Sequence, residues 1–231
     1  MPEHPGRRPA PTLAEDLLLL LLRPGSGTTV DENTLCHLLA GAVLADLALA
    51  EQVRTTRSPG GNVRVGAVGD REPSDPVLRS AWAAVTGKPR GVQTALAAIG
   101  PQVREPLLEN VVARGDVRRE TRRVFGLFAR EALVDGGTSR RADLVATLRA
   151  VLVDGQEPTT RTAALGGLLA GSGTLSGLGR EIPWTRPVIT RARDLERGTW
   201  GARTGAADPV RTVAATIVNS TTYAVSLLPR G

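Results

Sequence analysis

The chain has 231 residues, enough for one sizeable core, and its 41% hydrophobic and 23% charged residues are typical of a globular protein. Only 3% of the residues are aromatic, so the core must be built from Leu, Val, Ala and Ile, a composition that suits packed helices. Cys36 is the only cysteine, which excludes a disulfide framework, and the net charge of +6 rests on arginine, which pairs well with phosphate.

The N-terminal segment is predicted to be a disordered tail followed by a buried helix. Residues 1–11 are rich in proline and have little to bury. The spacing in Thr12–Glu15 is that of a capping box, which predicts a helix from there through Leu22. The apolar run of this helix is preceded by two acids and is far too short to span a bilayer. We find no export or transmembrane signal, so any membrane contact must be peripheral.

The next part of the chain is predicted to form the centre of the core. Asp31 can cap a helix that is apolar nearly all round as far as Leu49, which is typical of a central helix. Residues 62–68 alternate between apolar and polar side chains, which predicts a short strand. Asp75 and Pro76 open a further helix in which Trp82 belongs to the core.

The remaining elements complete a mainly α fold. An apolar stripe predicts a helix over residues 102–113, which Gly115 ends. Further helices are expected over residues 141–153, 159–169 and 186–197, and a last one opens at residue 208. Residues 117–131 instead predict a β-hairpin, because β-branched and aromatic residues surround a glycine. We expect one domain over residues 12–228, a helical bundle with a few short β-hairpins.

Residues that could carry out catalysis are scarce. Cys36 and His37 are adjacent, but neighbouring helix positions point about 100° apart, so we interpret both as buried core residues. Asp46 interrupts the most apolar helix and is interpreted as an acid paired with an arginine or a backbone group of another segment. With two histidines and no phosphate-loop or dinucleotide motif, we expect no enzyme, no metal and no cofactor.

The feature that stands out is the predicted hairpin. Between Val111 and Arg130 there are six arginines against Asp116 and Glu120, and the centre of the segment holds both phenylalanines of the chain. Arginines flanking an apolar tip are typical of shallow insertion below phosphate headgroups. The alternative is a hairpin folded onto the core with solvated arginines. Candidate membrane-contact residues are Arg118, Arg119, Arg122, Arg123, Val124, Phe125, Leu127, Phe128 and Arg130.

The order of motifs resembles that of the Golgi phosphoprotein 3 family, in its bacterial branch. The resemblance is carried by residues 12–20, 40–49 and 108–115 together with the hairpin, and it covers residues 12–226. It implies a peripheral adaptor that in eukaryotes binds phosphatidylinositol 4-phosphate and retains glycosyltransferases by their cytoplasmic tails. It also implies a role of the hairpin in membrane association and in contacts between copies.

The resemblance also implies a headgroup pocket made of one tryptophan and three arginines. The tryptophan falls at Asp31, the first two arginines fall at Ala40 and Pro101, and the last one is retained at Arg104. Most of the charge-assisted contacts of the pocket are therefore missing. We expect docking on anionic phospholipid rather than recognition of one headgroup, with Arg104 and Arg114 as candidate headgroup ligands.

Three functional hypotheses follow from the sequence. The leading one is a cytoplasmic protein peripherally associated with membrane, an adaptor for the cytoplasmic tails of membrane enzymes that forms a homo-oligomer through the hairpin. The second is a nucleic-acid binder, favoured by the pI of about 10.9 and the arginines of residues 186–203 but opposed by the scarcity of aromatic platforms. The third, an enzyme or small-ligand pocket, has only Asp46 and His37 to support it.

Overall fold

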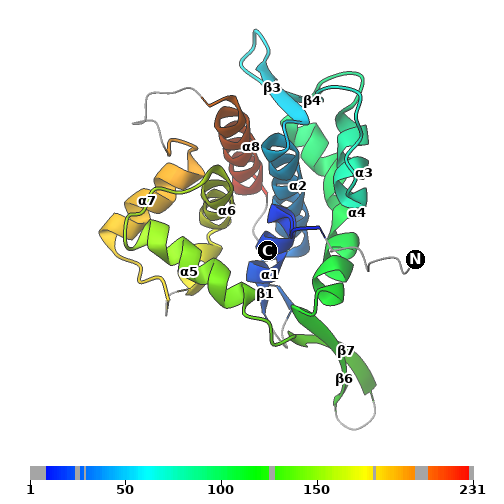
Figure 1. Cartoon of the computed structure of the whole chain (residues 1–231), viewed down its shortest axis with the longest axis vertical. Coiled ribbons are helices and arrows are strands. Elements are labelled where there is room, and N and C mark those ends of the chain that lie inside the picture. The colour runs from blue at the N-terminus through cyan, green and yellow to red at the C-terminus, as the bar shows by residue number, and fades with distance from the viewer. Residues whose placement is uncertain are drawn as a thin grey trace, which may run out of the picture.

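Helix α2 (Glu32–Leu49) lies at the centre of the fold, as its sequence predicts (Figure 1). The computed structural model describes residues 9–23, 27–28, 30–124, 128–178, 181–200 and 208–228. Within them α2 packs against five other helices, and the Asp31 side chain caps it by accepting a hydrogen bond from the Thr34 amide at 3.0 Å. Its mean hydropathy of 1.2 over 18 residues would suffice for a membrane span, but 72% of that stretch is buried inside the fold. We therefore interpret α2 as the core helix of this bundle.

Helix α1 (Leu13–Leu21) is buried along its whole length, and it runs beside α2. Thr12 caps it by accepting a hydrogen bond from the Glu15 amide at 3.1 Å, which confirms the start predicted from the capping box. The short strands β1 (Leu22–Arg23) and β2 (Gly27–Thr28) follow as an antiparallel pair. Because α1 has no exposed side, Glu15 and Asp16 are buried together with its leucines.

Helices α3 (Pro76–Val85) and α4 (Val92–Ala113) pack on α2 from one side. Asp75 caps α3 as predicted, and Trp82 is buried. The predicted start of α4 at Gln102 is wrong, because the helix begins ten residues earlier and contains Pro101 and Pro106. The reason lies in its contact with α2: a Cβ added to Gly100 would approach the Cys36 carbonyl oxygen to 2.8 Å. This close packing outweighs the local cost of glycine and proline inside a helix.

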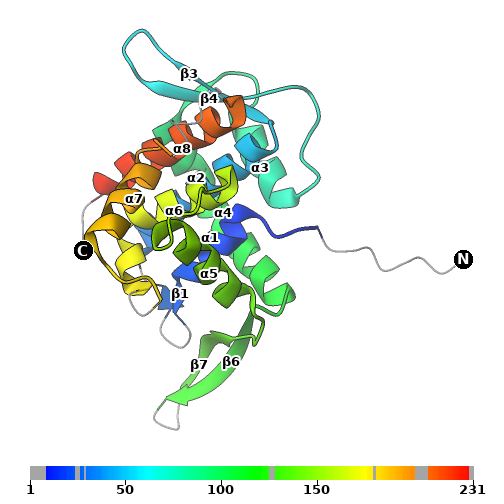
Figure 2. The ribbon, with the colours of Figure 1, turned by 60° about the vertical axis from the view of Figure 1, so that its left-hand side comes forward.

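Two antiparallel sheets project from opposite ends of the helical body (Figures 1 and 2). At one end lies a three-stranded sheet in the order β3 (Val53–Arg57), β4 (Val63–Ala67) and β5 (Arg90–Gly91), of which the sequence predicted only β4. At the other end β6 (Val117–Val124) pairs with β7 (Phe128–Asp135). This second pair confirms the predicted hairpin and extends it by four residues.

The C-terminal half consists of helices α5 (Arg140–Leu152), α6 (Thr160–Gly171), α7 (Arg186–Glu196) and α8 (Pro209–Ser226), with the short 3₁₀ helix η1 (Thr174–Leu178) after α6. All four α-helices were predicted, to within two residues at each start. Helix α6 packs against α7 and α8, and α8 packs against α2. The predicted tail at residues 1–11 lies outside the described residues as far as residue 8.

Helix α2 ends in a turn that normally requires glycine. The Glu51 amide donates to the Ala48 carbonyl at 3.0 Å and the Gln52 amide donates to the Leu47 carbonyl at 2.8 Å, which is the hydrogen-bond pattern of a Schellman motif. The residue after the C-cap then takes a left-handed conformation, and here that residue is Glu51, with a φ of 58°. A side chain in this conformation is strained.

We predict that Glu51→Gly raises the free energy of unfolding by about 0.5–1 kcal/mol, because relief of the strain exceeds the extra entropy of glycine in the unfolded chain. Ala50→Gly is the matched control, since Ala50 has a φ of −88° that any residue adopts. This control should lower stability by a similar amount. Urea denaturation of the three proteins measures both effects, and a loss of stability in Glu51→Gly would contradict the assignment of strain.

Candidate functional site

The β6–β7 hairpin, predicted to carry the membrane contacts, extends away from the helices (Figures 1 and 2). Its register pairs Val117 with Asp135 at the root and Val124 with Phe128 next to the tip. Residues 125–127 lie outside the described part, and so do the side chains of residues 122–131. The structure therefore places the strands of the predicted contact surface but leaves this set of its side chains undescribed: Arg122, Arg123, Val124, Phe125, Leu127, Phe128 and Arg130.

The two described arginines of the hairpin contact different parts of the molecule. Arg118 is exposed and donates long hydrogen bonds of 3.4 and 3.5 Å to the Asp135 carbonyl across the hairpin. Arg119 reaches α4, where its Nη2 lies 3.1 Å from a Glu105 oxygen and 2.5 Å from a Glu109 oxygen. The charge of Arg119 is thus balanced by α4, whereas no carboxylate within the described residues pairs with Arg118.

The candidate headgroup ligands are Arg104 on α4 and Arg114, the residue that caps the end of α4, and both have carboxylate partners. Arg104 Nε lies 2.9 Å from a Glu32 oxygen, a distance typical of an ion pair, although the N–H is not aligned for a hydrogen bond. Arg114 is more deeply placed and holds the buried Glu15 carboxylate at 2.6 Å. Ten residues of helix separate the two arginines by about 15 Å. They do not converge on one binding point.

A buried ion network joins the start of α1 to the root of the hairpin. Arg140, at the start of α5, places its guanidinium 2.6 Å from Asp16 and 2.5 Å from Asp116, the residue just before β6. Burial lowers the pKa of Arg140, but the hydrogen bonds and charges of Asp16 and Asp116 outweigh it and raise that pKa above its ordinary value. Arg161 on α6 binds the other oxygen of Asp16. The network thereby links α1, α5, α6 and the hairpin.

Asp46 on α2 belongs to the same region and confirms the interpretation made from the sequence. Its two carboxylate oxygens accept hydrogen bonds from the backbone amides of Leu13 and Ala14 at 2.8 and 3.0 Å, and Arg161 approaches one of them to 3.5 Å. Burial raises the pKa of Asp46 to about 7, although these amides and Arg161 act in the opposite direction. Asp46 thus positions the first turn of α1.

Cys36 and His37 are not the fully buried core residues that the sequence suggested, since both are only half-buried. His37 Nδ1 lies 2.8 Å from the Asn33 carbonyl oxygen, one turn earlier on α2. Burial, followed by the charge of Glu32, raises the pKa of the Cys36 thiol, which disfavours the reactive thiolate. Neither residue has the other as a partner within the described hydrogen bonds, so the pair does not form a catalytic dyad.

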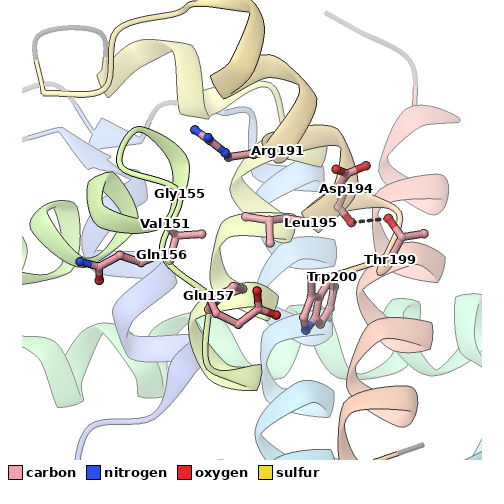
Figure 3. Close-up of a pocket in the computed structure, with 10 residues that line it drawn as sticks. Val151, Gly155, Gln156, Glu157, Arg191, Asp194, Leu195, Thr199 and Trp200 are labelled. Atoms are coloured by element: carbon pink, nitrogen blue, oxygen red, sulfur yellow. Dashed lines mark hydrogen bonds between the residues drawn. The ribbon is translucent and has the colours of Figure 1, made fainter. Parts of the chain in front are cut away.

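A cavity of about 500 Å³ opens between α7 and the α5–α6 connection (Figure 3). The guanidinium of Arg191 donates to the carbonyls of Leu152 and Val153 at 2.9 and 3.0 Å, at the end of α5. The polar ends of Arg191, Asp194 and Glu157 do not converge on one point in Figure 3. Among the described residues, these three side chains therefore do not form a joint arrangement of acid and base. Arg191, one of the arginines of residues 186–203, thus has a structural role.

Reasoning from the sequence missed Arg140, Arg141 and Arg161, which hold the buried region together. Arg141 donates hydrogen bonds to the carbonyls of Leu19 and Leu22, at the end of α1. The available signal was indirect: two adjacent acids at the start of a fully buried helix require cationic partners. The sequence did not show which of its many arginines would supply them.

The comparisons with known proteins point in one direction. The family model described as Golgi phosphoprotein 3 (GPP34) matches residues 13–217, which is most of the chain and includes the ion network and the hairpin. None of the curated proteins matches the chain.

We predict that Arg140→Ala lowers the free energy of unfolding by about 3–5 kcal/mol, because it leaves the buried Asp16 and Asp116 carboxylates without their shared partner. Arg149→Ala is the matched control on the same helix, since Arg149 forms an exposed ion pair with Asp154 at 3.1 Å. That pair should contribute less than about 1 kcal/mol. Equal losses for the two variants in urea denaturation would show that the network does not support the fold.

We further predict that the Asp46 carboxyl makes stability fall as pH rises. Its pKa is raised in the folded protein to about 7. The folded state therefore binds this proton more tightly, and the contribution is complete below about pH 4 and lost as pH approaches 7. It amounts to roughly 4 kcal/mol. The measurement is the free energy of unfolding between pH 4 and 8 for the wild type and Asp46→Asn, which lacks the titration. Asp143→Asn, at an exposed acid, is the control, and an unchanged slope in Asp46→Asn would contradict the prediction.

Proposed function

The chain belongs to the Golgi phosphoprotein 3 family, and from this premise we propose that it is a peripheral membrane-binding adaptor. It docks on anionic phospholipid through the β6–β7 hairpin. The observation that carries this proposal is the projection of that hairpin from the helical body. A hairpin folded flat on the core would have its tip covered by the protein, whereas this one extends beyond the helices.

The charges of the hairpin support docking on an anionic surface. Residues 117–135 contain five arginines against three acids, and the register places Arg122 opposite Arg130. Like charges at directly opposite positions destabilise a strand pair, and an anion between them relieves the repulsion. Phosphate groups of a membrane supply such anions, each basic residue near the surface contributing about 1 kcal/mol. The sequence adds the apolar residues Val124, Phe125, Leu127 and Phe128 at the turn between the two strands.

The contacts of Arg104 and Arg114 favour general anionic docking over recognition of one headgroup. Arg114 holds a buried carboxylate, and its release would leave Glu15 buried without this cation. Arg104 is the more available of the two, since 37% of its side chain is exposed and its partner Glu32 is itself exposed. In this proposal Arg104 contributes to headgroup contact, and phosphatidylinositol 4-phosphate is bound as one anionic lipid among others.

The remaining parts of the proposal rest on family membership. The protein acts at the cytoplasmic face of a membrane, has no enzymatic activity of its own, and binds cytoplasmic tails of membrane enzymes. A second copy of the chain can pair through the same hairpin. The buried ion network supports this mode of action, because it fixes the root of the hairpin to three helices of the body.

We predict that the wild type sediments with vesicles that contain phosphatidylserine or phosphatidylinositol 4-phosphate but not with neutral vesicles. The fraction that sediments should be smaller at physiological salt than at low salt. Changing Phe125 and Phe128 together to Ser should weaken this binding by about tenfold or more, because two apolar side chains lose their contact with the acyl region. Leu227→Ser is the control, since Leu227 is an exposed apolar residue just after α8.

Three outcomes of the sedimentation experiment bear on the proposal. Unchanged binding of the double variant would show that the hairpin is not the anchor. A strong preference for phosphatidylinositol 4-phosphate over phosphatidylserine would show that other arginines have rebuilt the headgroup pocket. Absence of binding to every anionic vesicle would refute membrane docking altogether.

A further inference from the structure

The segment that leads into α7 presents a tryptophan to solvent. Residues 183–187 are exposed, and Trp184 keeps 47% of its surface accessible. The other two tryptophans, Trp82 and Trp200, are only 6% and 7% exposed. The chain has only six aromatic residues, and three of them are tryptophans. Exposing one of these large apolar side chains to water costs free energy unless a partner covers it.

The backbone around Trp184 holds this side chain outside the core. Ile182 and Val188, on either side of the exposed segment, are buried at 0% and 1% exposure and anchor both of its ends. The Thr185 amide donates to the Pro183 carbonyl at 2.8 Å, and the Ile182 amide donates to the Leu178 carbonyl at the same distance. Two prolines further restrict the chain. The indole is therefore held in its exposed position before any partner binds. It does not lie on a loop that could fold back onto the core.

Arg141 connects this segment with the root of the hairpin. Its guanidinium donates to the Leu19 and Leu22 carbonyls, at the end of α1 and the start of β1. Burial lowers the pKa of Arg141, and the nearby charges of Asp135 and Glu181 act in the opposite direction. Asp135 is the last residue of β7, and Glu181 lies three residues before Trp184. Figure 2 shows β1 on the side of the helical body from which the hairpin extends.

The charges beside Trp184 match an anionic surface. Arg186, which follows it by two residues, is exposed. Arg23 at the end of β1, next to the Leu22 carbonyl that Arg141 binds, is exposed as well. Within the described residues neither arginine forms an ion pair. An amphipathic indole with nearby arginines is the combination found where a protein meets the water–lipid boundary.

We propose that Trp184 enters the headgroup region of the anionic membrane on which the hairpin docks and forms a second contact with it. This inference rests on the proposed function. Two separate contacts define the orientation of the molecule on the surface, which one hairpin alone cannot do. The sheet β3–β4–β5, at the opposite end, then faces away from the membrane.

The test uses tryptophan fluorescence together with vesicle sedimentation. The full chain is mixed with phosphatidylserine-containing vesicles whose acyl chains carry bromine, which quenches a nearby indole. We expect a blue shift and quenching of the wild-type emission, and neither change in Trp184→Phe, because Trp82 and Trp200 are buried. Trp184→Ala should weaken sedimentation by roughly five- to tenfold. Tyr223→Ala is the matched control: Tyr223 is 57% exposed, and it lines a cavity with residues of the β3–β4 turn at the opposite end.

The outcomes separate this inference from the proposed function. Sedimentation of the wild type without any change in its emission would overturn the role of Trp184 and leave hairpin docking in place. Quenching that persists in Trp184→Phe, or an equal loss of sedimentation in Tyr223→Ala, would also overturn it. Absence of sedimentation with anionic vesicles would overturn both proposals. Circular dichroism of each variant checks folding, which an exposed position should not disturb.

Discussion

The burial of two adjacent carboxylates at the start of α1 is the constraint on which the rest of the structure depends. Glu15 and Asp16 are taken out of water together with the leucines that follow them, and this is tolerated only because cations surround them. The partners come from three other helices: Arg114 from α4, Arg140 from α5 and Arg161 from α6. Helix α1 is therefore tied by ion pairs to helices of both halves of the bundle, in addition to the packing of α2 on α8.

The same constraint determines how the hairpin is held. Asp116 precedes β6 directly and shares the Arg140 guanidinium with Asp16, so the root of the hairpin is tied to the core by a buried ion pair. Arg119, three residues further along the chain, adds contacts to α4. Beyond this root the hairpin leaves the body. The strands of the hairpin are therefore held firmly at their base while they project from the helices.

Local chemistry in the sequence predicted much of this fold. Thr12, Asp31, Asp75 and Asp208 mark helix starts because a cap depends only on residues within one turn. The start of α4 was missed because the close contact of Gly100 with the Cys36 backbone is not local. The sequence predicted that Asp46 pairs with an arginine or a backbone group, but it did not identify the residue. Nothing in the sequence distinguishes Arg161 from the other arginines. The exposure of Trp184, likewise, depends on how its anchors pack.

The sequence separations within the ion network also determine the order in which its ion pairs can form while the chain is being synthesised. Arg114 follows Glu15 by 99 residues, Arg140 follows Asp16 by 124, and Arg161 follows Asp16 by 145. At a translation rate of roughly 5–20 residues per second, α1 waits on the order of ten seconds for its last cation. During that time the leucine-rich segment acquires the cations for its two acids one after another. The first helix of the chain is therefore among the last to reach its final ion pairs.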